Sequence, residues 1–488
     1  MRDDPFGPIS VFDMLKIGVG PSSSHTLGPW RAAEHFVATL RATDRLDEVV
    51  GVRVEFYGSL AKTGRGHGTG IAAMMGLAGH DPETCDVDEV QRLGPQTLAA
   101  GGLLLGGSCR LPFVRDRDIV FDGDVTLATH PNGMRFAATT NGGEVIEQVS
   151  YSLGGGFLAH EVADPGGRTE ETQEEISLPC PIESAADLID WCGDDRTIAE
   201  VVRSNERAWR GDAEIDLGLL RLRDAMRDCA FRGVSTSGTL PGGLGVARRA
   251  HALHAALLGP VDGRSSGEWF DTVRRCELGF GDTVRLVSCL ALAVNEENAA
   301  FGRVVTAPTN GAAGVIPAVL FHHLAQCDPD DVGRAEVDDI AMRFLLVAGE
   351  VGAIFKKRAT ISAAMGGCQA EIGVSSAMAA AALTECQGGS VGQSLMAAEI
   401  AMEHHLGMTC DPIGGLVQVP CIERNAMGAM KAISASHLAL ASTPALARVT
   451  LDDVIDTMWS TAQDMNVKYK ETAEGGLATR IPVSVVEC

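Results

Sequence analysis

The order of hydrophobic and polar residues divides the chain into two parts of different character. In residues 1–160 short stretches alternate apolar with polar positions, the pattern of a half-buried strand. This pattern predicts strands at Val49–Tyr57, Ile119–Leu127 and Val145–Leu153. Helical spacing predicts helices at Gly28–Leu40 and Gly70–Leu77. We therefore expect an N-terminal α/β domain over residues 1–160.

Beyond residue 184 strand-like alternation is nearly absent. Segments of helical length rich in alanine, leucine and methionine are separated by glycine-rich turns. They predict helices at Leu217–Asp228, Gly245–Leu258, Asp282–Glu297, Val337–Ile354, Ala370–Leu383, Val391–His404, Glu423–Leu440 and Leu451–Asp464. Residues 184–488 are thus expected to form a larger all-helical domain, which makes the fold class α+β and multidomain. The acidic stretch Ala163–Ile176 marks a linker over residues 161–183.

Charge and apolar content exclude several classes of function. The formal net charge of −24 leaves no excess of basic residues for binding nucleic acid or an anionic membrane. No apolar stretch of signal-peptide length follows Met1, and apolar runs such as Leu286–Val294 are too short to span a bilayer. We expect a cytoplasmic protein without nucleic-acid or membrane partners.

Cysteine usage indicates thiols in the reduced state. The 13 cysteines are odd in number and scattered through a long chain, unlike a disulfide scaffold. Most fit the description of small buried hydrophobic residues. This interpretation applies to Cys85, Cys109, Cys180, Cys192, Cys229, Cys276, Cys289, Cys327 and Cys386.

The other four cysteines are candidates for metal ligation. Cys368 and Cys421 each open a helical segment, and Cys410 precedes Asp-Pro-Ile-Gly-Gly. A helix N-terminus lowers the pKa of a thiol and favours the thiolate that metals bind. Their spacing matches no compact ferredoxin pattern, so spacing alone leaves a cluster and isolated thiols both open. Cys488 is the last residue, and its thiolate and terminal carboxylate could together chelate a metal; a frayed terminal thiol is the alternative.

Polar residues gather in loops that lead into predicted helices. The run Ser22, Ser23, Ser24, His25 and Thr26 offers hydroxyls, an imidazole and free backbone N–H groups at which a carboxylate could dock. His67 lies in a glycine-rich loop and His130 in a turn. The loop Thr306–Gly314, with Asn310 and Gly311, is suited to holding a small polar substrate.

Lysine placement argues against pyridoxal phosphate, the commoner cofactor for elimination from amino acids. That cofactor needs a lysine for its Schiff base, usually close to a glycine-rich phosphate cup. None of the lysines has such a setting: Lys16, Lys62, Lys356, Lys357, Lys431, Lys468 and Lys470. We expect no pyridoxal phosphate.

Taken in order, these motifs resemble the bacterial iron–sulfur-dependent L-serine dehydratases of the single-chain type. The similarity covers nearly the whole chain. It is carried by Ser10-Val-Phe-Asp-Met, Gly18-Val-Gly-Pro-Ser-Ser-Ser-His-Thr, Gly66-His-Gly-Thr, His130-Pro-Asn-Gly, Tyr151-Ser-Leu-Gly-Gly-Gly-Phe, Leu240-Pro-Gly-Gly-Leu, Asn295-Glu-Glu-Asn-Ala-Ala, Ala307-Pro-Thr-Asn-Gly-Ala-Ala-Gly, Gly367-Cys-Gln-Ala-Glu-Ile-Gly, Cys410-Asp-Pro, Val419-Pro-Cys-Ile-Glu-Arg-Asn and Lys468-Tyr-Lys-Glu-Thr.

The resemblance implies a cofactor, a reaction and an assembly. Cys368, Cys410 and Cys421 would hold a [4Fe–4S] cluster, with Cys488 on the fourth iron when no substrate is bound. The substrate would be L-serine, converted to pyruvate and ammonia by an L-serine ammonia-lyase. The N-terminal domain would correspond to the family's β domain and the helical domain to its catalytic α domain, in a homodimer.

A mechanism follows as a hypothesis. An open iron would act as a Lewis acid, and a base must remove the α-proton. His67 is the first candidate for that base because glycines flank it, and His130 is the second. The serine-rich run 22–26 with Asn310 and Gly311 would orient the substrate. The active site would then lie between the two domains.

Departures from the family pattern and two alternatives remain open. Arg358 and Met365 stand where the family usually has asparagine and glutamate, and Gly70 where aspartate is common. Cluster chemistry on threonine or another hydroxy acid is one alternative. The other is a non-catalytic iron–sulfur redox sensor, which would have no need of the polar loops.

Overall fold

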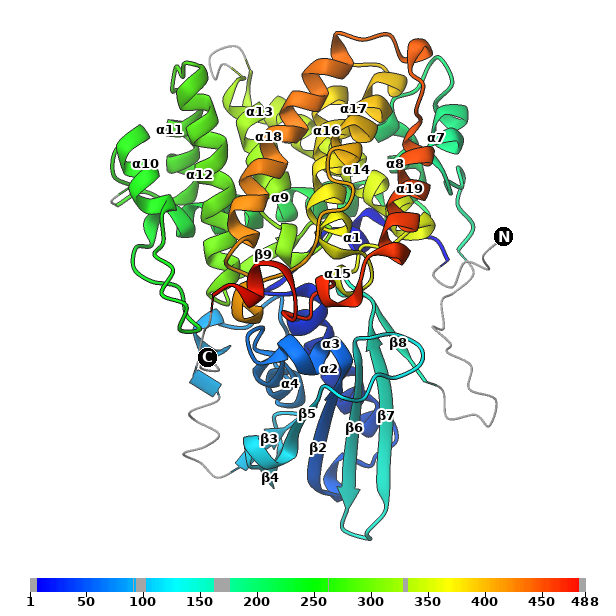
Figure 1. Cartoon of the computed structure of the whole chain (residues 1–488), viewed down its shortest axis with the longest axis vertical. Helices are drawn as coiled ribbons and strands as arrows, with labels where there is room; N and C mark the ends of the chain where they lie inside the picture. Colours follow the sequence, from blue (N-terminus) through cyan, green and yellow to red (C-terminus); the bar gives the residue numbers. More distant parts are fainter. Residues whose placement is uncertain are drawn as a thin grey trace.

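A computed structural model describes residues 7–90, 92–93, 102–161, 176–261, 263–327 and 332–481. Figure 1 shows a smaller α/β part below a larger helical part. The last described segment of the chain runs along the junction between these parts (Figure 1). No helix among the described residues is long and apolar enough to cross a membrane.

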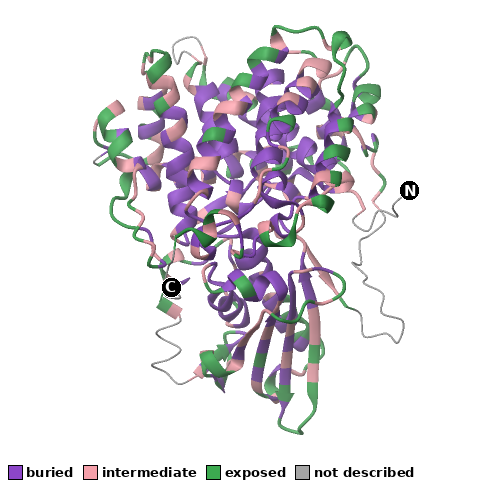
Figure 2. Ribbon diagram, in the orientation of Figure 1, coloured by how far each residue is buried: buried purple, intermediate pink, exposed green. Residues whose placement is uncertain are grey.

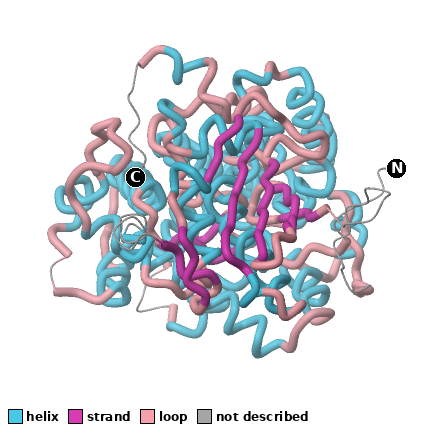
Figure 3. The backbone as a smooth tube through the Cα atoms, turned by 90° about the horizontal axis from the view of Figure 1, so that it is seen from below, coloured by secondary structure: helices cyan, strands magenta, loops and turns pink. Residues whose placement is uncertain are grey.

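The α/β part is built on a five-stranded mixed sheet, seen from below in Figure 3. Its strands lie in the order β5 (Ile119–Asp122), β2 (Val49–Tyr57), β6 (Gly133–Thr140), β7 (Val145–Ser152) and β8 (Leu158–His160). β2 and β5 are parallel and the other neighbours antiparallel. The sheet packs against a helix, where Phe36 of α2 (Gly28–Ala42) contacts Phe136 with ring centroids 5.6 Å apart.

Smaller elements complete the α/β part and present its polar loops. A π-helix, η1 (Ser23–Leu27), leads into α2, and α3 (Gly58–Gly64) is followed by α4 (Thr69–Leu77). The remaining elements are η2 (Leu46–Glu48), the β3 (Gly102–Leu105) and β4 (Cys109–Pro112) ribbon, and α6 (Arg115–Asp118). The predicted strand at 119–127 is shorter than expected because Asp122 Oδ1 accepts the backbone N–H groups of Asp124 and Val125, which turns the chain.

The helical part encloses the larger core, coloured as buried through its centre in Figure 2. All eight predicted segments overlap helices. These are α9 (Asp212–Ser235), α10 (Ala250–Leu258), α12 (Phe280–Ala299), α14 (Arg334–Arg358), α16 (Ile372–Cys386), α17 (Val391–Glu403), α18 (Cys421–Leu440) and α19 (Leu451–Asp464). Helices that the pattern did not predict are α7 (Ala185–Cys192), α8 (Ile198–Glu206), α11 (Ser266–Arg274), α13 (Val315–Ala325) and the short α15 (Ala363–Gly366). Short η segments lie at η3 (Asn310–Ala312), η4 (Gly367–Ala370), η5 (Ile413–Gly415), η6 (Pro444–Leu446), η7 (Val467–Tyr469) and η8 (Gly476–Thr479). The expected combination of an α/β part and a larger helical part is confirmed.

A short two-stranded sheet joins the N-terminal segment of the chain to the helical part. β1 (Lys16–Val19) pairs antiparallel with β9 (Arg303–Thr306), a strand inside the helical part that the sequence pattern did not indicate. The preceding helix α1 (Val11–Met14) buries Val11 and Met14 in the helical core. The first described residues therefore pack with the helical part, although they are adjacent in sequence to the α/β part. Most of the predicted linker, residues 162–175, lies outside the described residues.

Candidate active site

Side chains from both parts meet in one pocket. The α/β part contributes Ser22 and His67. The helical part contributes three cysteines, two glutamates and a set of glycine and apolar residues, namely Cys368, Cys410, Cys421, Glu371, Glu471, Gly311, Ile372, Pro412 and Val417. The pocket thus lies between the two parts, where the sequence analysis expects the active site.

Three of the four candidate cysteines converge here. Cys368 lies in η4, Cys410 in the loop before η5, and Cys421 is the first residue of α18. All three are buried and free. The Sγ atoms of Cys368 and Cys410 and a carboxyl oxygen of Glu371 lie within 4.8 Å of one another. Cys488 lies outside the described residues.

A guanidinium group faces the sulfur atoms. Arg424, one turn into α18, donates from Nη1 to Cys368 Sγ over 3.3 Å and to the Thr409 carbonyl over 2.7 Å. Its Nη2 donates to Asp411 Oδ1 over 2.9 Å. The neighbouring thiol of Cys368, together with burial, raises the pKa of Cys410 well above its usual value, and burial raises that of Cys421. The pocket therefore has one positive group beside three thiols, and those of Cys410 and Cys421 resist ionisation without a metal.

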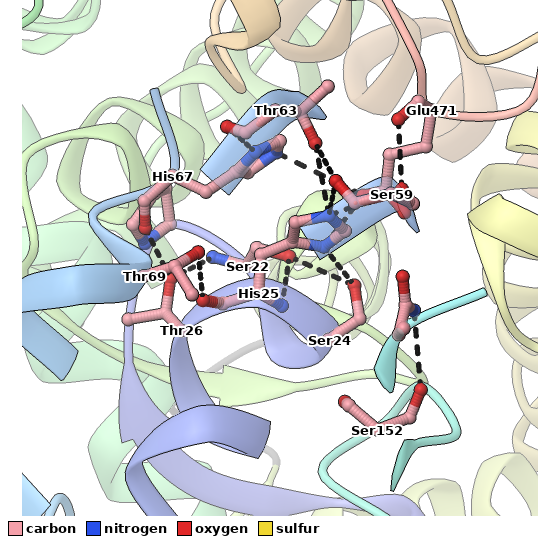
Figure 4. Close-up of polar contacts among 12 residues, drawn as sticks. Ser22, Ser24, His25, Thr26, Ser59, Thr63, His67, Thr69, Ser152 and Glu471 are labelled. Atoms are coloured by element: carbon pink, nitrogen blue, oxygen red, sulfur yellow. Dashed lines mark hydrogen bonds and ion pairs between the residues drawn. The ribbon is translucent and has the colours of Figure 1, made fainter. Parts of the chain in front are cut away.

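His67 presents a free ring nitrogen to the pocket. Its Nδ1 lies 2.9 Å from the Thr63 carbonyl oxygen, which can only accept, so Nδ1 carries the hydrogen and Nε2 keeps its lone pair. Burial lowers the pKa of His67 to about 4, so the ring is neutral at pH 7. Nε2 lies 3.9 Å from Glu471 Oε1 (Figure 4).

His25 stacks near His67 but has both nitrogens engaged. The two ring centroids are 4.6 Å apart. His25 Nε2 donates to the Ser59 carbonyl over 3.1 Å, and Nδ1 accepts from the Ser24 hydroxyl over 2.8 Å (Figure 4). Burial, and then the adjacent His67, lowers the pKa of His25 well below its usual value. His25 is therefore a structural neighbour of the free histidine.

His130 is not among the residues that line this pocket. Its Nδ1 accepts the backbone N–H of Asn132 over 3.1 Å, so the hydrogen of the neutral ring is on Nε2. Burial and then the positive charge of Lys356 lower the pKa of His130 to about 4. Of the two histidines that the sequence analysis proposed as bases, only His67 is among the residues that line the pocket.

The serine-rich run divides into lining and supporting residues. Ser22 lines the pocket, and its Oγ accepts the His25 backbone N–H over 3.1 Å. Thr26 Oγ1 donates to the His67 carbonyl over 2.8 Å and so fixes the glycine-rich loop. Ser23 and Ser24 are buried beside them. These hydrogen bonds tie the run to the loop that carries His67.

The loop Thr306–Gly314 contributes mainly backbone atoms to the pocket. Gly311 lines the pocket, and a Cβ there would lie 3.1 Å from Glu371 Oε1. The Asn310 side chain is used elsewhere: Nδ2 donates to the Val19 carbonyl over 3.0 Å, and Oδ1 accepts from Thr306 over 2.9 Å. Asn310 therefore joins β1 to the loop and is not among the pocket-lining residues.

The sequence analysis did not single out Glu371, Arg424 or Glu471. Glu371 follows Cys368 by three residues, and Arg424 follows Cys421 by three, so one helical turn would have brought each beside a candidate ligand. Glu471 occurs in the motif Lys468-Tyr-Lys-Glu-Thr, to which no role was given. Burial raises the pKa of Glu371 to about 7 and that of Glu471 well above its usual value.

The three departures from the family pattern do not line the pocket. Arg358, at the end of α14, is paired with Asp452 and Asp456, each over 3.0 Å. Met365 is half-buried in α15, and Gly70 is buried in α4. None of the three is among the residues of the pocket.

The fold and the pocket define a two-part protein with a buried, thiol-rich site at the junction of an α/β part and a helical part. Residues 10–163 match the family model of the serine dehydratase beta chain, and residues 194–478 match that of the alpha chain. The chain therefore belongs to the serine dehydratase family and is an enzyme.

Named relatives match over almost their entire length. The L-serine dehydratase of Mycobacterium bovis is 48% identical over 98% of this chain and 100% of its own length. That of Streptomyces coelicolor is 45% identical over 98% of this chain and 100% of its own. L-serine dehydratase 1 of Escherichia coli K12 is 44% identical over 97% of this chain and 99% of its own.

Proposed function

We propose that this protein is an L-serine ammonia-lyase, which eliminates water from L-serine to give an intermediate whose hydrolysis yields pyruvate and ammonia. The relatives named above are L-serine dehydratases and match nearly end to end. The observation that carries the proposal is the convergence of three buried, free cysteines with His67 in one pocket. A pocket of this kind can hold a metal centre next to a base.

The donor set fits a [4Fe–4S] cluster held by Cys368, Cys410 and Cys421. Three thiols gather without a disulfide among the described residues. The Cys368 thiol and burial oppose the ionisation of Cys410, and burial opposes that of Cys421, in the absence of a metal. Arg424 offers a positive charge to the Cys368 sulfur. Three protein ligands leave one iron open, and such an iron supplies a Lewis acid for the substrate's hydroxyl and carboxylate. We assign Cys488 to that fourth position in the absence of substrate.

The chain's own residues supply the proton acceptor. His67 Nε2 is the free nitrogen, held toward the pocket by the hydrogen bond from Nδ1 to Thr63. Because burial keeps the ring neutral, its lone pair is available to take the α-proton. His130, the second candidate, is not among the pocket-lining residues, so we assign the base to His67.

The polar loops orient the substrate and exclude water. Ser22 and the backbone around Gly311 line the pocket and would contact substrate directly. Ser23, Ser24, His25, Thr26 and Asn310 act through the loops that they hold in place. Loss of the α-proton and the hydroxyl gives aminoacrylate, which tautomerises to an imine and hydrolyses to pyruvate and ammonia.

The wider organisation is part of the same proposal. We assign residues 1–160 to a β-type domain, 161–183 to a linker and 184–488 to the catalytic α-type domain. The active assembly would be a cytoplasmic homodimer without pyridoxal phosphate. These assignments follow the family resemblance, and size measurement with cofactor analysis of the purified protein tests them.

The experiment that tests the function is anaerobic purification, followed by iron and sulfide analysis and a pyruvate-formation assay. Wild-type protein should contain iron and sulfide and act on L-serine in preference to L-threonine. Cys410→Ser should lose iron and activity, whereas Cys289→Ser, at a buried free cysteine outside the pocket, should keep both. Full activity without iron, or preference for threonine, would contradict the proposal, and a cluster without turnover would indicate a sensor.

A further inference from the structure

The carboxyl group of Glu471 is buried in the pocket with one oxygen unused. Oε1 lies 3.6 Å from His25 Nδ1 and 3.9 Å from His67 Nε2. Oε2 has no hydrogen-bond partner among the described residues, and the residue is only 4% exposed. A buried acceptor without a hydrogen-bond partner lowers the stability of the folded protein. The unpaired oxygen therefore points to a hydrogen-bond donor that arrives with the substrate.

The backbone at this position is held in a conformation that a glutamate rarely adopts. Glu471 has a φ of 57°, in the left-handed region. Both parts of the molecule fix it: its N–H donates to the Cys410 carbonyl over 3.0 Å, and Ser59 Oγ donates to its carbonyl over 3.0 Å. Backbone strain that is maintained by surrounding contacts is concentrated at functional sites. The contacts direct this side chain to the place where His67 and the thiols meet.

The electrostatics of the pocket leave Glu471 without a permanent counter-ion. None of the described residues that line it is a lysine or an arginine. The two histidines nearest Glu471 are kept neutral, because burial lowers the pKa of each. Arg424 is engaged by Asp411, Thr409 and Cys368 on the thiol side. A small cationic group that entered the pocket would therefore bring the positive charge that this carboxyl lacks.

We propose that Glu471 binds the α-ammonium group of the substrate and thereby makes the site selective for α-amino acids. This inference rests on the proposed function. The ammonium and the α-hydrogen are attached to the same carbon, and Glu471 Oε1 lies beside His67 Nε2. A substrate whose ammonium contacts Glu471 therefore presents its α-hydrogen to the proposed base. Glu371, the other carboxyl, lies 4.0 Å from Cys368 Sγ on the thiol side of the pocket.

The test compares two ligands that differ in the amine alone. L-Serine and 3-hydroxypropanoate share a carboxylate and a β-hydroxyl, and only L-serine has an ammonium. Their binding to anaerobically purified, cluster-containing protein is measured by stopped-flow absorbance of the cluster before turnover, with pyruvate formation assayed in parallel. Glu471→Gln should weaken L-serine binding roughly 30-fold or more, as expected when a buried charge pair loses one partner, and leave 3-hydroxypropanoate within about twofold. Glu371→Gln, the matched change at the other carboxyl, should not alter the ratio of the two affinities.

Several outcomes would overturn the inference. Equal weakening of both ligands by Glu471→Gln would show a structural role, and selective loss in Glu371→Gln would assign the ammonium to the other carboxyl. If Glu471→Gln loses iron, the comparison is made on the wild-type protein alone. Wild type should bind L-serine at least roughly tenfold tighter than 3-hydroxypropanoate, and equal binding of the two ligands would overturn the inference. A wild type that discriminates between the ligands but forms no pyruvate would contradict the proposed function and not this inference.

Discussion

At the scale of single residues, two equally buried histidines differ in which of their ring nitrogens are hydrogen-bonded. His25 and His67 are both buried and neutral, with rings 4.6 Å apart. The Thr63 carbonyl leaves Nε2 of His67 free, whereas Ser24 and Ser59 engage both nitrogens of His25. The different roles of the two rings depend on which polar atoms η1 and α3 bring to each, and the sequence around the histidines does not reveal this.

Glu350, in the interior of α14, should make stability depend on pH. Burial raises its pKa from 4.5 to about 7, with Glu206 and Glu183 adding to the rise and Lys357 opposing it. The folded state therefore binds this proton more readily than the unfolded state, so its contribution to stability falls as pH rises from about 4.5 through 7. Glu350→Gln should be near neutral at pH 5 and stabilising by at most about 3 kcal/mol at pH 8. Urea unfolding of both proteins at each pH measures this, and a pH-independent difference would contradict it.

At the scale of elements, the backbone N–H groups at the start of several helices donate to a glutamate that is distant in sequence. Glu206 accepts the N–H of Val11 at the start of α1 over 2.7 Å. Glu296 accepts that of Arg249, which precedes α10, over 2.7 Å. Glu385 accepts those of Ile198 and Ala199 in α8 over 2.8 and 3.1 Å. Such contacts satisfy N–H groups that a helix leaves unpaired and place a carboxylate at the positive end of its dipole.

Glu385→Ala should therefore destabilise the attachment of α8 to α16. The substitution leaves two buried N–H groups without acceptors, which costs about 1–3 kcal/mol for each unsatisfied group. The free energy of unfolding should fall by at least about 1 kcal/mol, and hydrogen exchange should quicken at Ile198 and Ala199. Glu200→Ala, which removes the exposed local cap partner of Thr197, is the control and should cost less. Unchanged exchange at Ile198 in Glu385→Ala would contradict this account.

At the scale of the whole molecule, periodicity predicted the longer helices and several strands but not the pairings between them. Val49–Tyr57 was placed correctly because its alternation reflects one buried face. β1 and β9 are short and are separated in sequence by the whole α/β part and by the helices up to α12, so no local pattern could pair them. The cysteines were candidates because of their chemistry, whereas Glu471 could not be placed. Its role depends on a strained backbone held by Cys410 and Ser59, which are distant from it in sequence.

The first residues of the chain offer a test of how the two parts depend on each other. Val11, Met14, Leu15 and Ile17 are buried in the core of the helical part, far in sequence from its helices. Burying one such side chain contributes about 1.5–3 kcal/mol, so the four together approach the stability of a typical domain. A fragment of residues 184–488 should consequently aggregate, or unfold at a lower temperature than the full chain, although it contains every helix predicted for the helical part. A peptide of residues 7–20 added to it should raise the melting temperature, because α1 packs on α14 and β1 on β9. The same peptide with Val11, Met14 and Ile17 changed to serine should not. A fragment that is as stable alone as with the peptide would show that the helical core closes without the N-terminal segment.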